Sequence, residues 1–578
     1  MIRAVSQILL ATGAMALAGA GNSPKSIVDL QPFRQTSSVH IEAPRGRHGE
    51  AVLVNLNPNI NAWFLLTVRW NDSPAVSSTW HLENPKPREA QILADEKYPA
   101  GLVISEAGSR YSCNLFGTAS SADVLEQARS STVVYYPLCE GRLFVRNPVR
   151  GARTTLETAT EFLRDQVWGG EKVIILFHHL MGERYRETGG SAQSGPSSAR
   201  PIAAAGPLPA LVDPVHADRL LSSASLGIAL DSSNAHENGM APGAWYPAAG
   251  YEGIYVSLMQ PDLASPHILE SFANLANKLD PVEATSLCYL IAFDLDRFDL
   301  GFASGTEYPG VGWSSRVLTQ MKDPALPGPD GIDTVEPLVS TGLISPASAP
   351  FTVATFTGGF KRTHGAFRYG DLSLKNHGSH YGFIENGVVF SKLQPGLATI
   401  FVSSDGTLSM KTWTESDNQR LATIGYARQN GVPLMETDDV SHTARPGRLV
   451  ARWGPGNWSG SEDEKLRTLR AGMALQSSHG KRFLIYAVFS DATPSAMARV
   501  FQAYQCNYAM LTDMNALEHT YLAVYRRSRS ELTVDHLLKG MSQLDKTVSG
   551  RIVPRFLGFP DNRDFFYVMR RDAAGTVQ

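Results

Sequence analysis

Cysteine is scarce in this sequence. The 578 residues contain four cysteines, and no Cys-x-x-Cys pair or Cys/His spacing suggests a zinc site. Four thiols in a chain of this length are also too few for a disulfide framework. Cys113 and Cys139 lie in one region and are expected to form a bridge. Cys288 lies inside an apolar run and is predicted to be buried, while Cys506 precedes another such run.

An excess of charge of either sign is also missing. Lys and Arg number 52 against 55 Asp and Glu, which gives a net charge of -3, and charged residues make up 19% of the chain. A near-neutral chain lacks the basic surface with which proteins bind nucleic acid. Hydrophobic residues make up 43%, enough for several cores. We therefore expect a folded protein of about three or four domains that does not bind nucleic acid.

Long apolar runs are missing beyond the N-terminus, so no integral membrane segment is expected in the mature protein. Residues 1–20 carry Arg3 ahead of an apolar stretch and end in Ala18-Gly19-Ala20, which is the pattern of a secretory signal peptide. An uncleaved anchor is the alternative, but Thr12 and Gly13 interrupt the apolar stretch. The sequence predicts export to the periplasm or the extracellular space.

Composition changes along the chain indicate its organisation. After the predicted signal peptide, apolar and polar residues alternate as they do in β-strands. A stretch rich in Gly, Ser, Pro and Ala then interrupts this pattern. The predicted class is α+β, with a mixed β-sheet core and flanking helices preceded by a separate β-rich domain. The expected units are a β-rich domain over 25–187, a flexible linker over 188–210, mixed regions over 211–345 and 346–530, and a helix-strand extension over 531–578.

Two glycines and several cationic residues follow a predicted strand in the second mixed region. In TFTGGFKRTHGAFRYG, Gly358 and Gly359 end the strand, and Lys361 and His364 lie in the loop that follows. Glycine lets backbone amides come close to a ligand, and cationic side chains could hold an anionic group such as a phosphate. The alternative is an ordinary glycine turn with solvated charges.

Further turn and strand signals follow in order. Asn386-Gly387 and Asp405-Gly406 are hairpin turns between predicted strands. Arg470 lies near the start of a later strand, the capped helix TPSAMARVFQAYQ comes next, and a final strand ends at Asp513. The hairpins define a scaffold and imply no chemistry by themselves.

This order of motifs resembles the phosphodiester glycosidase domain family, known from the uncovering enzyme that removes N-acetylglucosamine from a mannose phosphodiester. The resemblance covers about a third of the chain. Thr357 stands where the family has the asparagine of its Asn-Gly-Gly-Phe loop, and residues 514–517 replace the Gly-Gly-Gly-Ser of its final Leu-Asp-Gly-Gly-Gly-Ser motif. The matching positions are Gly358, Gly359 and Phe360, the two hairpin turns, Arg470 and Asp513.

The resemblance implies scission of the anomeric bond of a sugar. Such chemistry usually needs one carboxylic acid and a second group that activates water or attacks, although cations can assist a phosphate leaving group. Asp513 is the first candidate for the acid/base or nucleophile, or else its carboxylate caps the next turn. Glu518 or His519 could supply the second group, or else they are surface residues. His364 could act as an acid or donor near neutral pH.

Candidate substrate-binding residues come from three segments. Gly358, Gly359 and Lys361 form the glycine loop, and Arg470 could bind a phosphodiester through two hydrogen bonds or form a structural ion pair. In AFDLDRFDLG, Asp294 and Asp296 lie on one face of a strand, close enough to share a ligand or to pair with nearby basic residues such as Arg297.

The leading hypothesis is an exported hydrolase of the phosphodiester glycosidase type. Its substrate would be a sugar phosphodiester or a phosphorylated envelope glycan, and no cofactor or metal is expected. A non-catalytic envelope protein that binds glycan, and a structural scaffold without a ligand, are the alternatives.

Overall fold

The computed structural model of the protein describes residues 25–116, 123–154, 157–158, 206–231, 239–314, 317–361, 372, 381–438, 443–452, 467–528 and 531–571. The predicted signal peptide, His364 and most of the predicted linker lie outside these residues. The described chain is mostly β-sheet with few helices. None of the helices in these ranges is long and apolar enough to span a bilayer.

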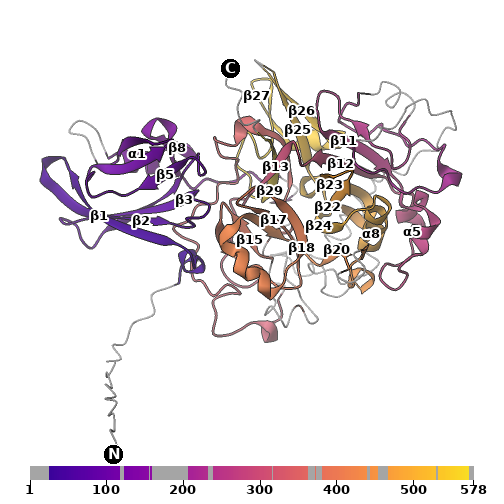
Figure 1. The fold of residues 1–578 in the computed structure, drawn as a ribbon, viewed down its shortest axis with the longest axis horizontal. Helices are drawn as coiled ribbons and strands as arrows, with labels where there is room; N and C mark the ends of the chain where they lie inside the picture. Colours follow the sequence, from indigo (N-terminus) through magenta and orange to yellow (C-terminus); the bar gives the residue numbers. More distant parts are fainter. Residues whose placement is uncertain are drawn as a thin grey trace, which may run out of the picture.

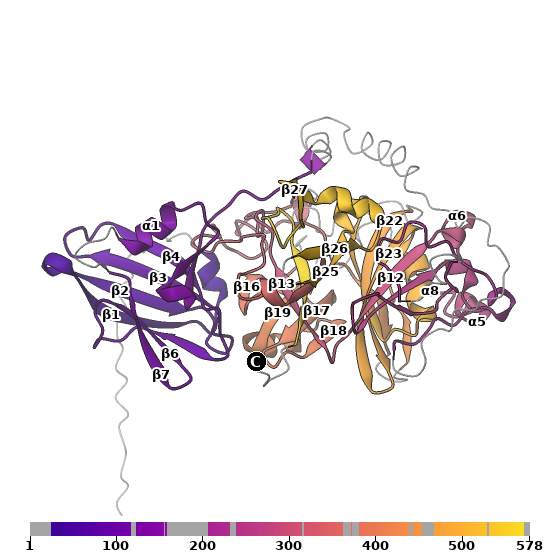
Figure 2. The same ribbon diagram turned by 90° about the horizontal axis from the view of Figure 1, so that it is seen from above.

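Two sheets form the N-terminal part, and Figures 1 and 2 show them in indigo to one side of the rest of the chain. Alternating residues such as Leu53, Phe64 and Leu66 are buried between the sheets, as expected for strands with one solvated face. One sheet has the order β1 (Gln35–Ala43), β2 (Arg47–Asn55), β3 (Trp63–Trp70), β4 (Ser77–Glu83), β9 (Leu143–Arg146), β8 (Tyr135–Leu138), the other β5 (Ala90–Leu93), β6 (Gly101–Glu106), β7 (Ser109–Asn114), and α1 (Val124–Ser130) packs beside them.

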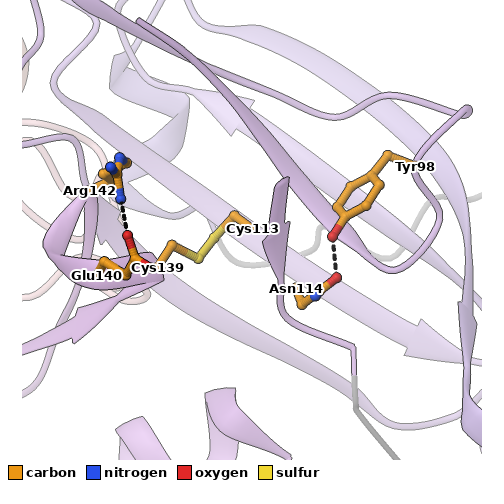
Figure 3. The surroundings of a disulfide bond; sticks show 6 residues. All are labelled: Tyr98, Cys113, Asn114, Cys139, Glu140 and Arg142. Carbon is orange, nitrogen blue, oxygen red and sulfur yellow. Dashed lines mark hydrogen bonds and ion pairs between the residues drawn. A yellow bond between two sulfur atoms is a disulfide. The ribbon is translucent and has the colours of Figure 1, made fainter. Parts of the chain in front are cut away.

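A disulfide joins Cys113 of β7 to Cys139, as Figure 3 shows. This confirms the predicted bridge. Cys288 and Cys506 are free thiols and both are buried, because each lies among apolar strand or helix residues.

The largest sheet combines strands from the two mixed regions of the sequence. Strand β12 pairs antiparallel with β23, so no sheet boundary separates residues 211–345 from residues 346–530. The sheet order is β10 (Tyr246–Pro247), β11 (Ile254–Met259), β12 (Cys288–Asp294), β23 (Lys481–Ala492), β22 (Thr468–Ser478), β24 (Tyr508–Met514), β20 (Pro433–Thr437), β21 (Ala444–Pro446).

Helix α8 (Pro494–Ala503) lies against this sheet and is buried on all sides. Its predicted start is confirmed, since the Thr493 side chain accepts a hydrogen bond from the backbone N–H of Ala496 and Pro494 occupies the first turn. Two short helices, α5 (Pro266–Glu270) and α6 (Pro281–Thr285), precede β12 in the sequence.

Two five-stranded sheets complete the core. The predicted hairpins are confirmed, because Asn386-Gly387 joins β15 to β16 and Asp405-Gly406 joins β17 to β18, with positive φ at Asn386, Gly387 and Gly406. The sheets are β13 (Phe298–Ala303), β29 (Phe565–Arg570), β14 (Thr352–Thr357), β25 (Leu522–Arg527), β26 (Leu532–His536), and β16 (Val388–Ser391), β15 (Phe383–Glu385), β19 (Ile424–Gln429), β17 (Ala398–Ser403), β18 (Leu408–Thr412).

The helix with which the predicted helix-strand extension over 531–578 should begin is wrong. Its first residues belong to β26, which pairs with β25, and a 3-10 helix follows at Lys539–Leu544. Gly540 disfavours a longer helix, and His536 and Asp545, which close the segment, are joined by a hydrogen bond of 3.0 Å. The small hairpin of β27 (Lys546–Val548) and β28 (Arg551–Val553) then leads to β29.

A buried ionic cluster links the N-terminal sheets to the core. Arg146 of β9 forms an ion pair with Glu83 of β4, and its guanidinium lies 3.7 Å from Glu385 of β15. The backbone N–H and hydroxyl of Ser304 both donate to Glu385. Burial nevertheless raises the pKa of Glu385 to about 7, and the charge of Arg146 only partly opposes this shift.

This cluster predicts a pH dependence of folding stability. Between pH 4.5, the ordinary pKa of a glutamate, and a pH of about 7, folded Glu385 holds a proton that the unfolded chain has lost, so its contribution to stability falls as the pH rises through this window. A Glu385→Gln variant, which cannot lose that proton, should show a smaller fall. Urea unfolding of both proteins across the window measures the difference, and parallel curves would contradict the assignment.

Candidate active site

A carboxylate lies at the end of β24, on a strand that is otherwise almost entirely apolar. Asp513 is buried, and its Oδ2 atom accepts a hydrogen bond of 2.8 Å from Nη1 of Arg563. Its Oδ1 atom accepts one of 2.8 Å from the backbone N–H of Met514. Burial raises the pKa of Asp513 to about 7, although the charge of Arg563 opposes the shift. The carboxyl can therefore change its protonation state near neutral pH.

Arg563 connects Asp513 to two further groups. Its Nη2 atom lies 2.6 Å from Nε2 of His519, and its Nε atom lies 3.2 Å from Oε1 of Glu157. The Nδ1 atom of His519 lies 2.6 Å from the carbonyl oxygen of Met514. Because a carbonyl only accepts and a guanidinium only donates, these contacts fit a neutral histidine with its proton on Nδ1.

Lys361, from the predicted glycine loop, lies in the same cluster. Its Nζ atom is 2.9 Å from Oε1 of Glu157 and 2.8 Å from Oε2 of Glu307, which also pairs with Arg153. Burial favours a higher pKa for Glu157, but the charges of Arg563 and Lys361 outweigh it and lower the pKa well below its usual range. Glu157 therefore stays ionised and holds the two cations together.

The two glycines allow close packing inside the protein. The N–H of Gly358 donates to the carbonyl of Asp564, and a Cβ at Gly358 would lie 2.7 Å from Oδ2 of that residue. The N–H of Phe360 donates to Oδ1 of Asn430, while Arg428 donates to the Phe360 carbonyl and to Asp564. The glycines thus bring the loop next to Asp564, at the place where the sequence left open either a bound anionic group or an ordinary glycine turn.

Several buried polar atoms in this neighbourhood have no hydrogen-bond partner in the described part of the chain. They include the hydroxyl of Tyr308, Oδ1 of Asn562 and Oδ1 of Asp564. Burial raises the pKa of Tyr308, and the charges of Asp564, Arg428, Arg563 and Asp513 also act on it. Asn562 donates through Nδ2 to Glu157. Unsatisfied buried polar atoms are where a bound polar group would gain hydrogen bonds.

Arg470 does not join this cluster. It lies opposite Met514 and donates to the Met514 sulfur and to the carbonyl of Ala492. A β-bulge between Arg470 and Gly472 shifts the register of β22 against β24 by one residue. Without that shift Arg470 would lie opposite Asp513; with it, Arg470 lies opposite Met514. Arg470, a candidate substrate-binding residue, therefore does not meet Asp513 in one site.

Asp294 and Asp296 also lie elsewhere. Asp294 ends β12, pairs with Lys481 through a contact of 2.9 Å, and accepts a hydrogen bond from the backbone N–H of Asp296 in the turn to β13. It lies opposite Phe483 on β23, whereas Arg470 lies opposite Phe489, roughly 20 Å further along the strand. Asp294 thus forms an ion pair and Asp296 forms part of a turn. The partner of Asp294 is Lys481 and not the expected Arg297, which pairs with Glu252.

Glu518 lies beside the cluster. It belongs to the short 3-10 helix Leu517–His519, is buried, and contributes to the electrostatic field at Arg563. Its Oε1 atom lies 3.5 Å from the Thr154 hydroxyl. The structure thus brings together Asp513, Glu518, Lys361, Gly358 and Gly359, while Arg470, Asp294 and Asp296 lie apart and His364 is outside the described residues.

The residues that hold this cluster together were not predicted from the sequence. Arg563 and Asp564 lie in the run Asp561-Asn562-Arg563-Asp564, just before the apolar strand β29. Four polar residues in succession ahead of a buried strand were a usable signal, since such residues are rarely buried without a partner. Glu157 and Glu307 carry no comparable pattern in the sequence.

Comparisons with known proteins give little similarity. No family model and no curated protein matches the chain. The catalytic domain of zebrafish N-acetylglucosamine-1-phosphodiester alpha-N-acetylglucosaminidase, auto-inhibited by its pro-peptide, is 10% identical, with 56% of this chain and 85% of that chain covered and a TM-score of 0.30. A putative exported protein from Burkholderia pseudomallei is 10% identical (50% and 75% covered, TM-score 0.19), and a hypothetical protein from Synechocystis is 10% identical (93% and 99% covered, TM-score 0.25). Similarity at this level assigns neither a fold family nor an activity.

Proposed function

We propose that the protein is an exported glycoside hydrolase that acts on a sugar phosphodiester or a phosphorylated envelope glycan. The observation that carries the proposal is the packing of Asp513, Arg563 and Lys361 beside the Gly358-Gly359 loop. Two of the motifs that resemble the phosphodiester glycosidase family, distant in the chain, meet in this cluster. We also propose that residues 346–530, which hold most of this cluster, form an α+β domain whose mixed sheets are flanked by helices. The Cys113–Cys139 disulfide supports export, because disulfides persist in oxidising compartments.

In the proposed reaction, water attacks the anomeric carbon of the sugar. The carboxylate of Asp513 takes a proton from that water, the bond between the anomeric carbon and the phosphate oxygen breaks, and the phosphate leaves with the bonding electrons. Arg563 and Lys361 are the cations that could hold the phosphate, since charge-assisted hydrogen bonds to its oxygens are strong. Glu518 and His364 remain proposals for the second acid/base group.

Non-catalytic glycan binding is the second candidate function. It is favoured by the pairing inside the cluster, where Arg563 and Lys361 already contact Asp513, Glu157 and Glu307. A substrate phosphate would have to replace some of these contacts. The side chains of residues 514–517, which stand where the glycosidase family has glycine, favour the same alternative.

Replacing Asp513 by asparagine tests the catalytic role. We expect kcat/KM on sugar-1-phosphodiesters to fall at least a hundredfold, because a general base contributes about 10²–10⁴-fold. In the wild type the rate should rise with pH through about 7, as Asp513 loses its proton. The matched control is Asp294→Asn, which changes another buried, ion-paired aspartate roughly 20 Å away along the sheet.

Equal rates for wild type and Asp513→Asn would remove the catalytic claim. Glycan binding that survives the substitution, without turnover of any phosphodiester by the wild type, would favour the second candidate function.

A further inference from the structure

A large cleft lies between the N-terminal sheets and the core, outside the Asp513 cluster. Its volume is about 1000 Å³, at the upper end of the range of small-molecule sites. Strands β1, β2 and β5 form one wall, and the turns after β15 and β17 form the other. Arg88 crosses between the walls and donates to the carbonyl of Ser404 at 3.2 Å. The cleft is therefore built from both parts of the chain.

Polar side chains with free hydrogen-bonding capacity face this cleft from both walls. Gln35 and Gln91 line the N-terminal wall, and Ser403 and Ser404 line the core wall. Within the described ranges, none of these four side chains forms a hydrogen bond. Asn61 is different, since its amide donates to the carbonyls of Pro87 and Ala90 and so fixes the wall. Amides and hydroxyls both donate and accept, which matches the hydroxyl groups of a sugar.

The charges in the cleft disfavour an anionic ligand. The charged side chains that line it are Arg88, Glu89 and Asp299, of which two are carboxylates. Asp299 is paired with Arg571 at 2.8 Å. A phosphate or other polyanion would meet no excess of positive charge here. Small apolar surfaces, such as that of Ile60, could contact the C–H groups of a sugar ring.

Two strands connect the cleft to the Asp513 cluster. Strand β29 follows Asp564 and reaches the cleft at Met569, and β19 runs from Tyr426 in the cleft to the neighbourhood of Arg428. At about 3.3 Å per residue, the five steps from Asp564 to Met569 span roughly 17 Å, whereas the two steps from Tyr426 to Arg428 span roughly 7 Å. The cleft is thus a neighbouring place, but its lining includes none of Asp513, Arg563, Lys361, Glu157 and His519.

We infer that this interdomain cleft binds a neutral oligosaccharide of several units, held by Gln35 and Gln91 on one wall and by Ser403 and Ser404 on the other. The inference stands on the lining of the cleft and holds whether or not the Asp513 cluster hydrolyses a phosphodiester. The competing occupant is an extended peptide that pairs with the edge strand β5. Such a peptide would offer fewer hydrogen-bond partners to the hydroxyls of Ser403 and Ser404 on the core wall.

Calorimetric titration of the full chain tests the inference. The probes are neutral hexasaccharides, namely α-1,4-, β-1,4- and β-1,3-linked glucose and β-1,4-linked N-acetylglucosamine. We expect at least one to bind, and a Gln35→Ala/Gln91→Ala double variant to bind it at least tenfold more weakly, because each lost hydrogen bond costs about 0.5–1.5 kcal/mol. Ser404→Trp, which fills the opposite wall, should weaken binding as well. Gln127→Ala, an exposed glutamine on α1 outside the cleft, should bind like the wild type.

Three results would overturn the inference. They are no binding of any of the four probes up to about 10 mM, binding that the double variant and Ser404→Trp leave unchanged, or tighter binding of an unstructured peptide than of every hexasaccharide. Asp513→Asn should keep the binding, so failure of the hydrolase proposal and failure of this inference are distinguishable.

Discussion

Replacing Arg563 by methionine is expected to lower the free energy of unfolding by about 3–5 kcal/mol. Arg563 is buried and contacts Asp513, His519 and Glu157. Methionine fills much of the same space but leaves Asp513 without its cation and Glu157 with Lys361 as its main counter-charge. A charge that is buried in a medium of low dielectric constant is costly without a partner. The destabilisation therefore comes mainly from the buried carboxylates that lose their counter-charge.

The matched control for Arg563→Met is Arg571→Met. Arg571 pairs with Asp299, but the two side chains are 40% and 32% exposed, so water and salt screen the pair. Its loss should cost less than about 1 kcal/mol. Urea unfolding of the two variants and the wild type measures the difference. Similar midpoints for both variants would show that the cluster around Arg563 contributes little to folding.

Removal of the Cys113–Cys139 disulfide is expected to destabilise the N-terminal sheets by about 3–4 kcal/mol. The two residues are separated by 26 positions, and the bond restricts the unfolded loop between them. It also holds β7, the edge strand of the small sheet, to the segment that follows β8. We expect the Cys113→Ala/Cys139→Ala variant to unfold in this part at lower urea concentration, as limited proteolysis between residues 35 and 146 would detect.

Reducing agent supplies the control for the disulfide. Dithiothreitol should lower the unfolding midpoint of the wild type to that of the double variant, and should leave the double variant unchanged. An oxidised wild type that unfolds at the same midpoint as its reduced form would show that the bond contributes no stability.

Local sequence patterns predicted the elements whose causes are local. The turns at Asn386-Gly387 and Asp405-Gly406 form because the residues at positive φ are glycine or asparagine. Helix α8 begins where Thr493 and Pro494 predict it. The carboxylate at the end of β24 and the glycine loop after β14 are also placed as the pattern indicates, and they lie in one cluster.

Long-range pairing decided the rest of the candidate site. Arg563 reaches Asp513 because β29 pairs with β14, more than 200 residues earlier, and no local pattern specifies such a partner. The extra residue that β24 has between Leu511 and Met514 places Arg470 opposite Met514 instead of Asp513, which alternation alone does not reveal. The 3-10 helix at Lys539–Leu544 replaced a predicted α-helix because β26 pairs with β25.

The central position of β29 has a consequence for how the chain is made. Strands β13 and β14 lie on either side of β29, and each pairs with it along its length. During translation both strands leave the ribosome long before residues 565–570 are synthesised. The edges of β13 and β14 that pair with β29 in the folded protein are therefore unpaired during this time. A nascent chain in this condition cannot complete its tertiary structure early. Until β29 is made, the open edges of β13 and β14 can pair with strands of other chains, so the nascent chain is prone to aggregation.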